Sequence, residues 1–446
     1  MSEAGGKREV AALAWPLAVG FLAYTLLGVV DTMLMGRVST AAQAGVGLSV
    51  TIVFSFMAFF RGVTRGAQAL VAAADGAQDE GRKEQAASAG LLLGLVSGLL
   101  AAALLSTFAG PVLRQVVEDA DVLQASLAYL AVRVWGLPFM LLGFGALAAL
   151  QGVGDTKARM WASLVGNGVN GVLSLILVFG WGPIPAFGAA GAAMGSVVGD
   201  LLMAVVYLVR FGQRFGAPGA TSFSVLKDAL TLGLPDGLQC QGNVLAFLVM
   251  NLALARAGAE HLAASQVVLQ LVSVSFLPGV GVGEAAGVLV GRYLGAGQPE
   301  LAARSMASAR VLAVSAMSAC GLVFATGGTW LASWFTQDPA VLALTGPLLL
   351  LAASFQVGDA VATVHLCALR GAGDVRFTLL ASLGCAWGLL VPSALGLGLG
   401  LGWGATGAWV GLLVEVSGLA LLTAWRVRGL REGRVGRLDL LLGAAN

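Results

Sequence analysis

Residues 160–199 read MWASLVGNGVNGVLSLILVFGWGPIPAFGAAGAAMGSVVG and contain no Asp, Glu, Lys or Arg. A helix that crosses the hydrocarbon core of a bilayer needs about 20 consecutive apolar residues. This one stretch is therefore long enough for two passes, and we expect helices over 158–181 and 186–211.

Similar charge-free stretches recur along the whole chain, and 377–414 is again long enough for two passes. The chain is 58% hydrophobic and 11% charged, whereas a soluble domain carries about 25% charged residues. Continuous apolar runs do not alternate as the strands of a membrane barrel do. The sequence therefore predicts an all-α integral membrane protein with twelve transmembrane helices. The other ten are expected at 10–35, 42–72, 86–110, 122–150, 229–255, 262–291, 303–327, 340–368, 377–400 and 404–426.

The basic residues predict the orientation. With the N-terminus in the cytoplasm, 19 of the 25 Lys and Arg residues fall in inner loops and tails, and Arg61, Arg65 and Arg133 fall inside predicted helices. Only Arg37, Arg114 and Arg256 fall in outer loops. Because cytoplasmic loops carry the excess of positive charge, we expect both termini inside and a multi-pass protein of a bacterial inner membrane. The net charge of +2 gives no reason to expect a nucleic-acid partner.

An internal repeat organises the chain. An offset of 219 residues places Pro16 over Pro235, Gly62 over Gly281, and Gly152-Val-Gly-Asp over Gly371-Ala-Gly-Asp. After a shift of three residues, Gly188-Ala-Ala-Gly-Ala resembles Gly404-Ala-Thr-Gly-Ala. Two six-helix repeats that enter from the same side are related by an axis along the membrane normal. We therefore expect two pseudo-two-fold-related lobes. They are an N-lobe over 1–211 and a C-lobe over 229–446, joined by a cytoplasmic linker over 212–228.

Several segments resemble the MATE (multidrug and toxic compound extrusion) family of the MOP flippase superfamily. They are Gly28-Val-Val-Asp-Thr-Met-Leu-Met-Gly36, Gln151-Gly-Val-Gly-Asp-Thr156, Leu289-Val-Gly-Arg-Tyr-Leu-Gly-Ala-Gly297, Phe355-Gln-Val-Gly-Asp-Ala360 and Arg370-Gly-Ala-Gly-Asp374. They occur in the family's order over nearly the whole chain. Residues 60–66 are closer to the DinF-like branch and 355–359 to the NorM-like branch, and we favour the DinF-like one.

Asp31 is the first candidate for a functional residue. It lies about 30 Å along the first helix, and an ionisable group within a membrane helix is a functional hypothesis by default. A buried carboxyl group can bind and release a proton near neutral pH. The alternative is a carboxylate that caps the helix at the outer interface. The resemblance implies that Asp31 is the ion-coupling carboxylate of the N-lobe, and that the first helix can bend at Pro16.

The resemblance also implies ion-coupling partners for Asp31. Asn170 matches the family's Asn, Ser174 stands where the family has a second carboxylate, and Ser196 is the expected hydroxyl. With one anionic ligand fewer, the cluster favours H⁺ over Na⁺. Asn167, one turn away, is expected to be a structural hydrogen-bonding residue.

In the C-lobe, Asp359 resembles a family residue that binds ions or cationic substrates, and Glu284 is a further candidate for an ion or substrate site. Asn243 stands where the NorM-like branch has a Glu, which again weakens a sodium interpretation. We expect Asp236, directly after Pro235, to favour the N-terminus of its helix. Asp200, Arg133 and Glu415 are expected to have partners within their own lobes rather than to contact substrate.

Arg65 and Glu284 are separated by the repeat offset, so they are equivalent positions of opposite charge. We expect them to form a gate, an ion pair between the lobes that stabilises the outward-open state. The alternative is that each residue pairs within its own lobe.

Together with the resemblance, these residues predict a secondary antiporter. It would export small amphipathic compounds, cationic by preference, in exchange for protons by alternating access. The alternatives are Na⁺-coupled multidrug export and a flippase for lipid-linked precursors. The chain has no Walker A sequence and no catalytic motif. We expect no enzyme activity, no cofactor and no metal site, and a monomer in the lipid bilayer.

Overall fold

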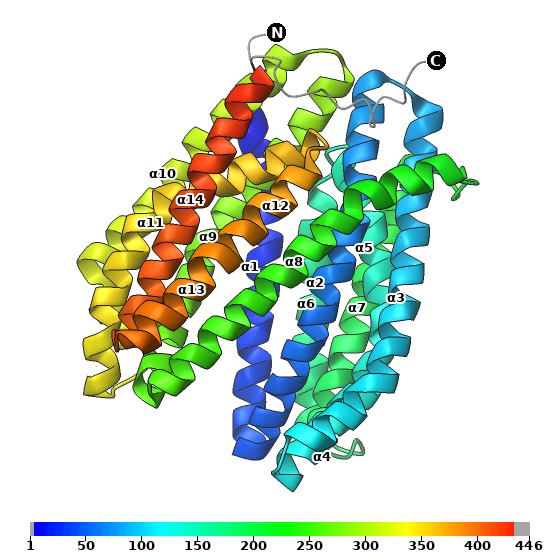
Figure 1. The fold of residues 1–446 in the computed structure, drawn as a ribbon. Coiled ribbons are helices and arrows are strands. Elements are labelled where there is room, and N and C mark those ends of the chain that lie inside the picture. Colours follow the sequence, from blue (N-terminus) through cyan, green and yellow to red (C-terminus); the bar gives the residue numbers. More distant parts are fainter. Residues whose placement is uncertain (1–3, 432–446) are drawn as a thin grey trace. The chain divides into compact units, whose positions relative to one another are not determined.

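The protein is described by a computed structural model over residues 4–431, leaving aside the side chains of 24, 26–33, 430 and 431. Within that part the regular elements are helices, and β-structure is limited to one isolated bridge between Trp181 and Ile184 (Figure 1). The helices up to the middle of the chain are α1 (Lys7–Val38), α2 (Thr40–Ala77), α3 (Glu80–Val116), α4 (Ala120–Arg133), η1 (Val134–Gly136), α5 (Leu137–Gly152), α6 (Lys157–Phe179) and α7 (Ala189–Phe215).

The helices of the second half follow the same order. They are α8 (Phe223–Ala257), α9 (Ala259–Gly295), α10 (Pro299–Ala332), α11 (Pro339–Gly371), α12 (Val375–Cys385), η2 (Ala386–Leu390), α13 (Val391–Ser393), η3 (Ala394–Gly400) and α14 (Gly404–Arg431). Elements α12 to η3 follow one another without a loop and form one span over Val375–Gly400. The π-helical turns η2 and η3 flank Pro392, whose missing N–H interrupts the regular ladder.

The predicted all-α membrane fold is confirmed. Among the described helices, 11 are long and apolar enough to cross a membrane. A further helix, α1, is 32 residues long. Elements α4, η1 and α5 form a single span, Ala120–Gly152. The 3₁₀ turn η1 lies just before Pro138, which cannot donate a hydrogen bond to the preceding turn. Each of the twelve predicted spans thus has a helical counterpart.

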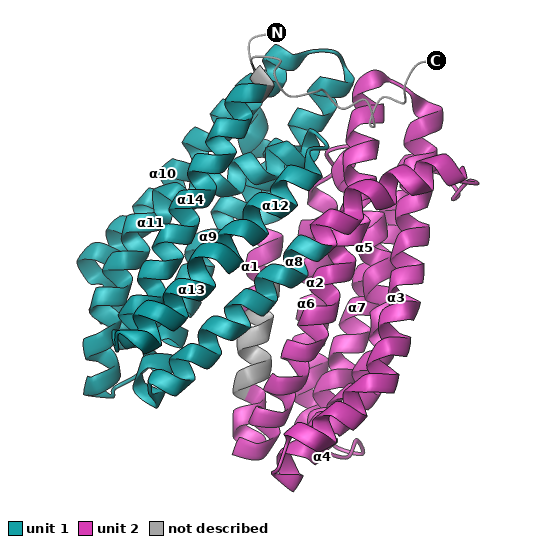
Figure 2. Ribbon diagram, viewed as in Figure 1, with its two compact units in different colours: residues 1–18, 238–446 teal, residues 19–237 magenta. Residues whose placement is uncertain are grey.

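The chain forms two compact units, which Figure 2 shows in different colours. One consists of residues 19–237, and the other of residues 1–18 and 238–446. The boundaries fall inside α1 and α8, just beyond Pro16 and Pro235. Each unit therefore contains the first part of the opening helix of the other repeat. The predicted boundaries at 211 and 229, which follow the repeat, stay a prediction.

In the unit of residues 19–237, the first part of α8 packs on α2 through glycine. A Cβ atom added at Gly62 would lie 2.5 Å from Gly237 Cα, and one at Gly66 would strike the carbonyl oxygen of Ala229. Protein interiors do not tolerate such overlaps. Glycine on α2 therefore lets the two backbones approach closely, as small residues do between membrane helices.

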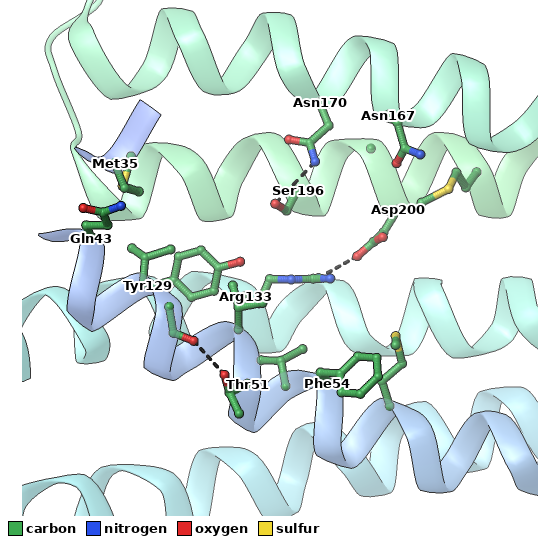
Figure 3. Close-up of a pocket in the computed structure, with 17 residues that line it drawn as sticks. Met35, Gln43, Thr51, Phe54, Tyr129, Arg133, Asn167, Asn170, Ser196 and Asp200 are labelled. Carbon is green, nitrogen blue, oxygen red and sulfur yellow. Dashed lines mark hydrogen bonds and ion pairs between the residues drawn. The ribbon is translucent and has the colours of Figure 1, made fainter. Parts of the chain in front are cut away.

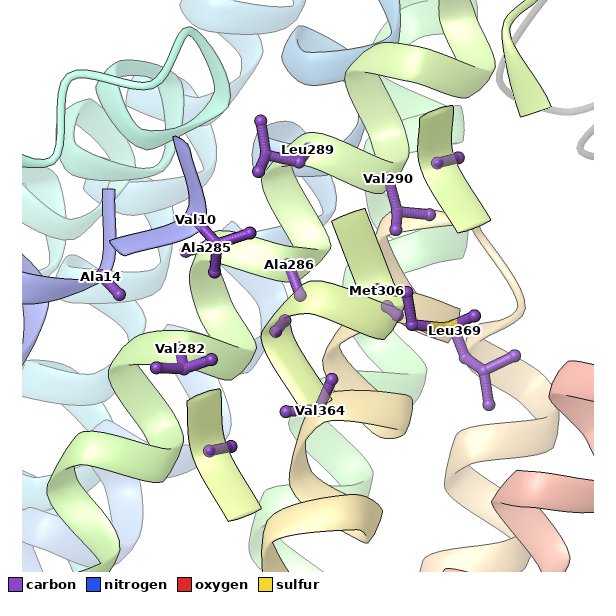
Figure 4. Close-up of a cluster of buried hydrophobic side chains, with 14 of the residues drawn as sticks. Val10, Ala14, Val282, Ala285, Ala286, Leu289, Val290, Met306, Val364 and Leu369 are labelled. Carbon is purple, nitrogen blue, oxygen red and sulfur yellow. The ribbon is translucent and has the colours of Figure 1, made fainter. Parts of the chain in front are cut away.

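The other unit repeats this contact between α1 and α9. A Cβ atom at Gly281, the repeat equivalent of Gly62, would lie 3.1 Å from the carbonyl oxygen of Ala14. Val10 and Ala14 belong to a buried cluster that also contains Val282, Ala285 and residues of α10 and α11 (Figure 4). The start of α1 is thus part of the hydrophobic core of the unit formed mainly by α9 to α14.

The segment expected as a linker is largely helical at both ends. Helix α7 runs to Phe215 and α8 begins at Phe223, so residues 216–222 are the non-helical part. This part is held on α3, because Gly219 N–H donates to Ser88 Oγ at 3.1 Å. Ser222 N–H donates to Gln85 Oε1 at 3.3 Å.

Candidate functional site

Three of the predicted ion-coupling residues meet between α6 and α7. Ser174 Oγ donates to Asn170 Oδ1 at 2.8 Å, and Asn170 Nδ2 donates to Ser196 Oγ at 3.5 Å. Asn170 and Ser174 are one turn apart on α6, so they point to the same side of the helix. A Cβ atom at Gly195 would lie 3.0 Å from Asn170 Oδ1. The glycine on α7 therefore leaves the space that the polar side chains occupy.

Asp31, the fourth member of the predicted cluster, lies in α1. Its side chain is outside the described residues. The structure thus brings Asn170, Ser174 and Ser196 together, all of them buried. The coupling role of the cluster stays a prediction.

A cavity of about 410 Å³ adjoins this cluster. The end of α1, together with α2, α4, α6 and α7, forms its walls, and all its lining residues belong to the unit of residues 19–237. Figure 3 shows Asn170 and Ser196 on one side and Thr51 and Phe54 of α2 on the other. Val, Met and aromatic side chains dominate the wall, and a few polar groups converge on it. This composition is typical of a small-molecule site.

An ion pair lies in the wall of the cavity. Arg133 Nη1 is 2.5 Å from Asp200 Oδ2, and the two residues are 7% and 5% exposed. Arg133 is the last residue of α4, and Gly136 in the following turn leaves room for the pair. A Cβ atom at Gly136 would lie 2.5 Å from Arg133 Nη1. The expectation that both residues have a partner in their own lobe is confirmed, but their place in the cavity wall was not expected.

Asn167 also lines the cavity, on α6 one turn before Asn170. Its side chain is 7% exposed, and its Nδ2 atom has no hydrogen-bond partner among the described residues. A buried amide without a partner costs about 1–3 kcal/mol. Among the described residues, no acceptor therefore supports the expected structural role of Asn167 through its Nδ2 atom. Its spacing of three residues from Asn170 is the sequence signal that places it on the same face.

The predicted C-lobe residues lie in two places. Asn243 on α8 exchanges hydrogen bonds with Ser382 on α12, at 3.0 and 3.2 Å. Asp359 lies on α11 and Glu415 on α14, both in the unit that contains residues 238–446. The expected partner of Glu415 within its own lobe stays a prediction. The ion or substrate roles of Asp359 and Asn243 stay predictions.

Arg65 has a partner that the repeat did not indicate. Its Nη1 atom lies 3.2 Å from Asp236 Oδ2, and both residues belong to the unit of residues 19–237. The prediction that Asp236 favours a helix N-terminus is wrong, because α8 begins at Phe223 and Asp236 lies in its interior. Glu284 is a buried residue of the other unit. Its pairing with Arg65 stays a prediction.

Comparison with known proteins gives consistent results along the chain. The family model described as MatE matches residues 16–176 and 241–395. A probable multidrug resistance protein NorM from Burkholderia pseudomallei (strain K96243) is 32% identical over 429 residues, covering 94% of this chain and 92% of that protein. A multidrug resistance protein NorM from Burkholderia vietnamiensis is 31% identical, with 94% and 93% covered.

The fold is also that of a solved transporter. A structure described as the outward-facing conformation of a multidrug resistance MATE family transporter of the MOP superfamily aligns with a TM-score of 0.88. The alignment covers 95% of this chain and 96% of that chain at 20% identity. These two sequence relatives carry the NorM name, and the assignment to the DinF-like branch stays a prediction.

Proposed function

The chain belongs to the MATE family, whose members are transporters rather than enzymes, and from this membership we propose that it exports small amphipathic compounds in exchange for protons. Cytosolic compound binds in the cavity, proton binding from outside lowers its affinity, and the compound leaves outward by alternating access. The protein needs no cofactor for this cycle. It acts as a monomer in a bacterial inner membrane with both termini in the cytoplasm.

The observation that carries the proposal is the cavity of about 410 Å³ beside the Asn170–Ser174–Ser196 cluster. Apolar walls suit the hydrophobic part of an amphipathic compound. The polar cluster lies on α6 and α7, next to the space through which such a compound would pass. A group that binds a proton there can change the affinity of the cavity for its ligand, because the two sites share residues.

Proton coupling is favoured over sodium coupling by the chemistry of the cluster. Asn170, Ser174 and Ser196 supply neutral oxygen atoms, and Ser174 stands where the family resemblance implies a second carboxylate. Asp31 is then the one anionic group that the proposal assigns to the cluster. A single carboxylate suffices to bind a proton, whereas hard cations are held by several oxygen ligands.

Export of a cationic dye from cells into medium corresponds to uptake by inside-out vesicles. We would therefore measure dye uptake into such vesicles with an imposed pH gradient in sodium-free buffer. Wild type and Asp31→Asn are compared at equal protein amounts. We expect uptake by wild type and its loss in the variant. Uptake by both would place the coupling group elsewhere, with Asp359 tested next.

The same vesicles separate the two alternatives. Sodium coupling requires that a sodium gradient drives uptake when the pH gradient is collapsed. A lipid-precursor flippase would leave a broad dye panel untransported, and such a flippase is expected to have a basic cavity. The described cavity instead pairs its Arg133 with Asp200, so no observation on this cavity favours the flippase.

A further inference from the structure

The ion pair between Arg133 and Asp200 is not a requirement of the fold. The repeat offset of 219 residues places Ala352 at the position equivalent to Arg133. The offset of 216 that holds after the loop at 180–188 places Val416 at the position equivalent to Asp200. Both residues are buried and apolar. The same helix arrangement is thus built in the second half with apolar residues at these two positions, and this packing is often as stable as a buried ion pair.

The pair is nevertheless placed where a ligand would meet it. Both residues line the cavity, with Arg133 reaching from α4 across to Asp200 on α7 (Figure 3). Ser196, one turn before Asp200 on α7, belongs to the predicted coupling cluster and lines the same cavity. Arg133 and Asp200 therefore border both the apolar space and the polar cluster.

Asn167 supplies an independent observation that points to a ligand. Its equivalent in the second repeat is Ala386, which is buried and apolar. Asn167 lines the cavity, and its Nδ2 atom is buried and has no hydrogen-bond partner among the described residues. Buried polar groups in native proteins are nearly always paired. A donor without a protein partner at the wall of a cavity is therefore suited to a hydrogen-bond acceptor on the ligand.

The opposite charges of Arg133 and Asp200 limit which ligands the pair can accept. A purely cationic ligand that contacts Asp200 competes with Arg133 and leaves a buried guanidinium without its carboxylate. A purely anionic ligand that contacts Arg133 leaves the buried carboxylate of Asp200 without its guanidinium. Breaking a buried pair from one side is strongly unfavourable. A zwitterionic ligand avoids both losses, because its anionic group can pair with Arg133 while its cationic group pairs with Asp200.

We propose that Arg133, Asp200 and Asn167 are specificity-determining residues that make the cavity prefer zwitterionic amphipathic compounds over compounds that carry only a positive charge. The carboxylate of such a compound contacts Arg133 and Asn167 Nδ2, its cationic group contacts Asp200, and its apolar body lies against Phe54 and Met57. This inference rests on the proposed export function and refines its substrate class.

The experiment uses a matched pair of xanthene dyes, one zwitterionic with a free carboxylate and the other its cationic methyl ester. Binding of each dye to the purified full-length protein is measured by fluorescence polarisation, and uptake of each is measured in the vesicles described above. We expect wild type to bind the carboxylate dye at least about tenfold more tightly than the ester, a ratio that corresponds to 1.4 kcal/mol.

Two variants test the assignment of the residues. Arg133→Gln with Asp200→Asn removes both charges at once and leaves no unpaired ion, so we expect a folded protein that binds both dyes with similar affinity. Asn167→Ala removes only the unpartnered donor. We expect it to weaken binding of the carboxylate dye severalfold and to leave binding of the ester unchanged. A melting curve of each variant checks that the fold is intact.

The outcomes separate this inference from the proposed function. Preference for the carboxylate dye in wild type and its loss in the double variant support the inference, even if neither dye is transported, which would count against export alone. Equal binding of both dyes by wild type, or a preference that survives in the double variant, overturns the inference while leaving export intact. Binding of neither dye also overturns it. If the double variant does not fold, the binding ratio of the Asn167→Ala variant decides.

Discussion

The guanidinium of Arg65 on α2 lies 3.2 Å from the carboxylate of Asp236 on α8. Asp236 is 2% exposed and follows Pro235 in the interior of the helix. The pair therefore lies beside the glycine contact through which the first part of α8 packs on α2. It adds a charged interaction to a contact that otherwise depends on close backbone approach.

Removing Arg65 is expected to destabilise the protein more than removing both charges. Arg65→Gln takes the cation away from a buried carboxylate, and breaking such a pair from one side costs about 3 kcal/mol. The double variant Arg65→Gln with Asp236→Asn leaves no ion behind. Thermal unfolding of the purified single and double variants, analysed as a double-mutant cycle, gives the coupling between them. A coupling energy near zero would show that the pair does not stabilise this contact.

Arg65 also tests the proposed gate with Glu284. If the two residues pair during the transport cycle, Arg65→Glu and Glu284→Arg should each abolish dye uptake, and the combined charge swap should restore part of it. The reference and all variants carry Asp236→Asn, because Arg65→Glu would otherwise place a second carboxylate beside the buried Asp236. Failure of the swap to restore uptake, with normal amounts of protein in the membrane, would exclude the gate.

The residue at position 174 is expected to influence the coupling ion. Ser174→Asp places a second carboxylate beside Asn170. In the wild type, Ser174 Oγ donates a hydrogen bond to Asn170 Oδ1. An added anionic oxygen strengthens binding of a hard cation. We expect dye uptake by this variant to respond to a sodium gradient, which the wild type should not do. Ser174→Asn has the same shape without the charge and is the matched control. A sodium response in both variants would contradict the electrostatic explanation.

The internal repeat provides a matched pair for the helix contact. Gly62→Ala brings a Cβ atom to 2.5 Å from Gly237 Cα, whereas the nearest atom to a Cβ at Gly281 is the Ala14 carbonyl oxygen at 3.1 Å. Overpacking of this kind costs about 1–3 kcal/mol. Gly62→Ala should therefore lower the melting temperature more than Gly281→Ala does. Equal effects would mean that the two contacts relax to the same extent.

The helices were predictable because hydropathy and charge are local properties of the sequence. The runs around 158–181 and 186–211 became α6 and α7 with small changes at their ends. Asn170 and Ser174 were predictable as neighbours because they are one turn apart on one helix. Asp31 was singled out by its charge within an apolar run, and its side chain lies outside the described residues.

Contacts between distant helices were not predictable from these local patterns. The repeat offset connected Arg65 with Glu284, but the observed partner of Arg65 is Asp236, which no offset or motif indicates. Asp200 and Arg133 were recognised as charges within helices, yet their shared place in the cavity wall depends on how α4 and α7 pack. Pro16 and Pro235 marked special positions. The first parts of α1 and α8, which end near these prolines, each belong to the compact unit of the other repeat. This exchange of helix segments was visible only from the packing of α1 on α9 and of α8 on α2.

The exchange of helix segments has a consequence for biosynthesis. Val10 and Ala14 pack in a core whose other members come from α9, α10, α11 and α14, and from Ala372 directly after α11. During translation at about 5–20 residues per second, the start of α1 therefore waits tens of seconds before its partners have been made. Splitting the gene at the codons for residues 216–222, between the repeats, would give two polypeptides. Neither of them would contain a complete compact unit. Each half should then accumulate in the membrane only when the other is synthesised with it.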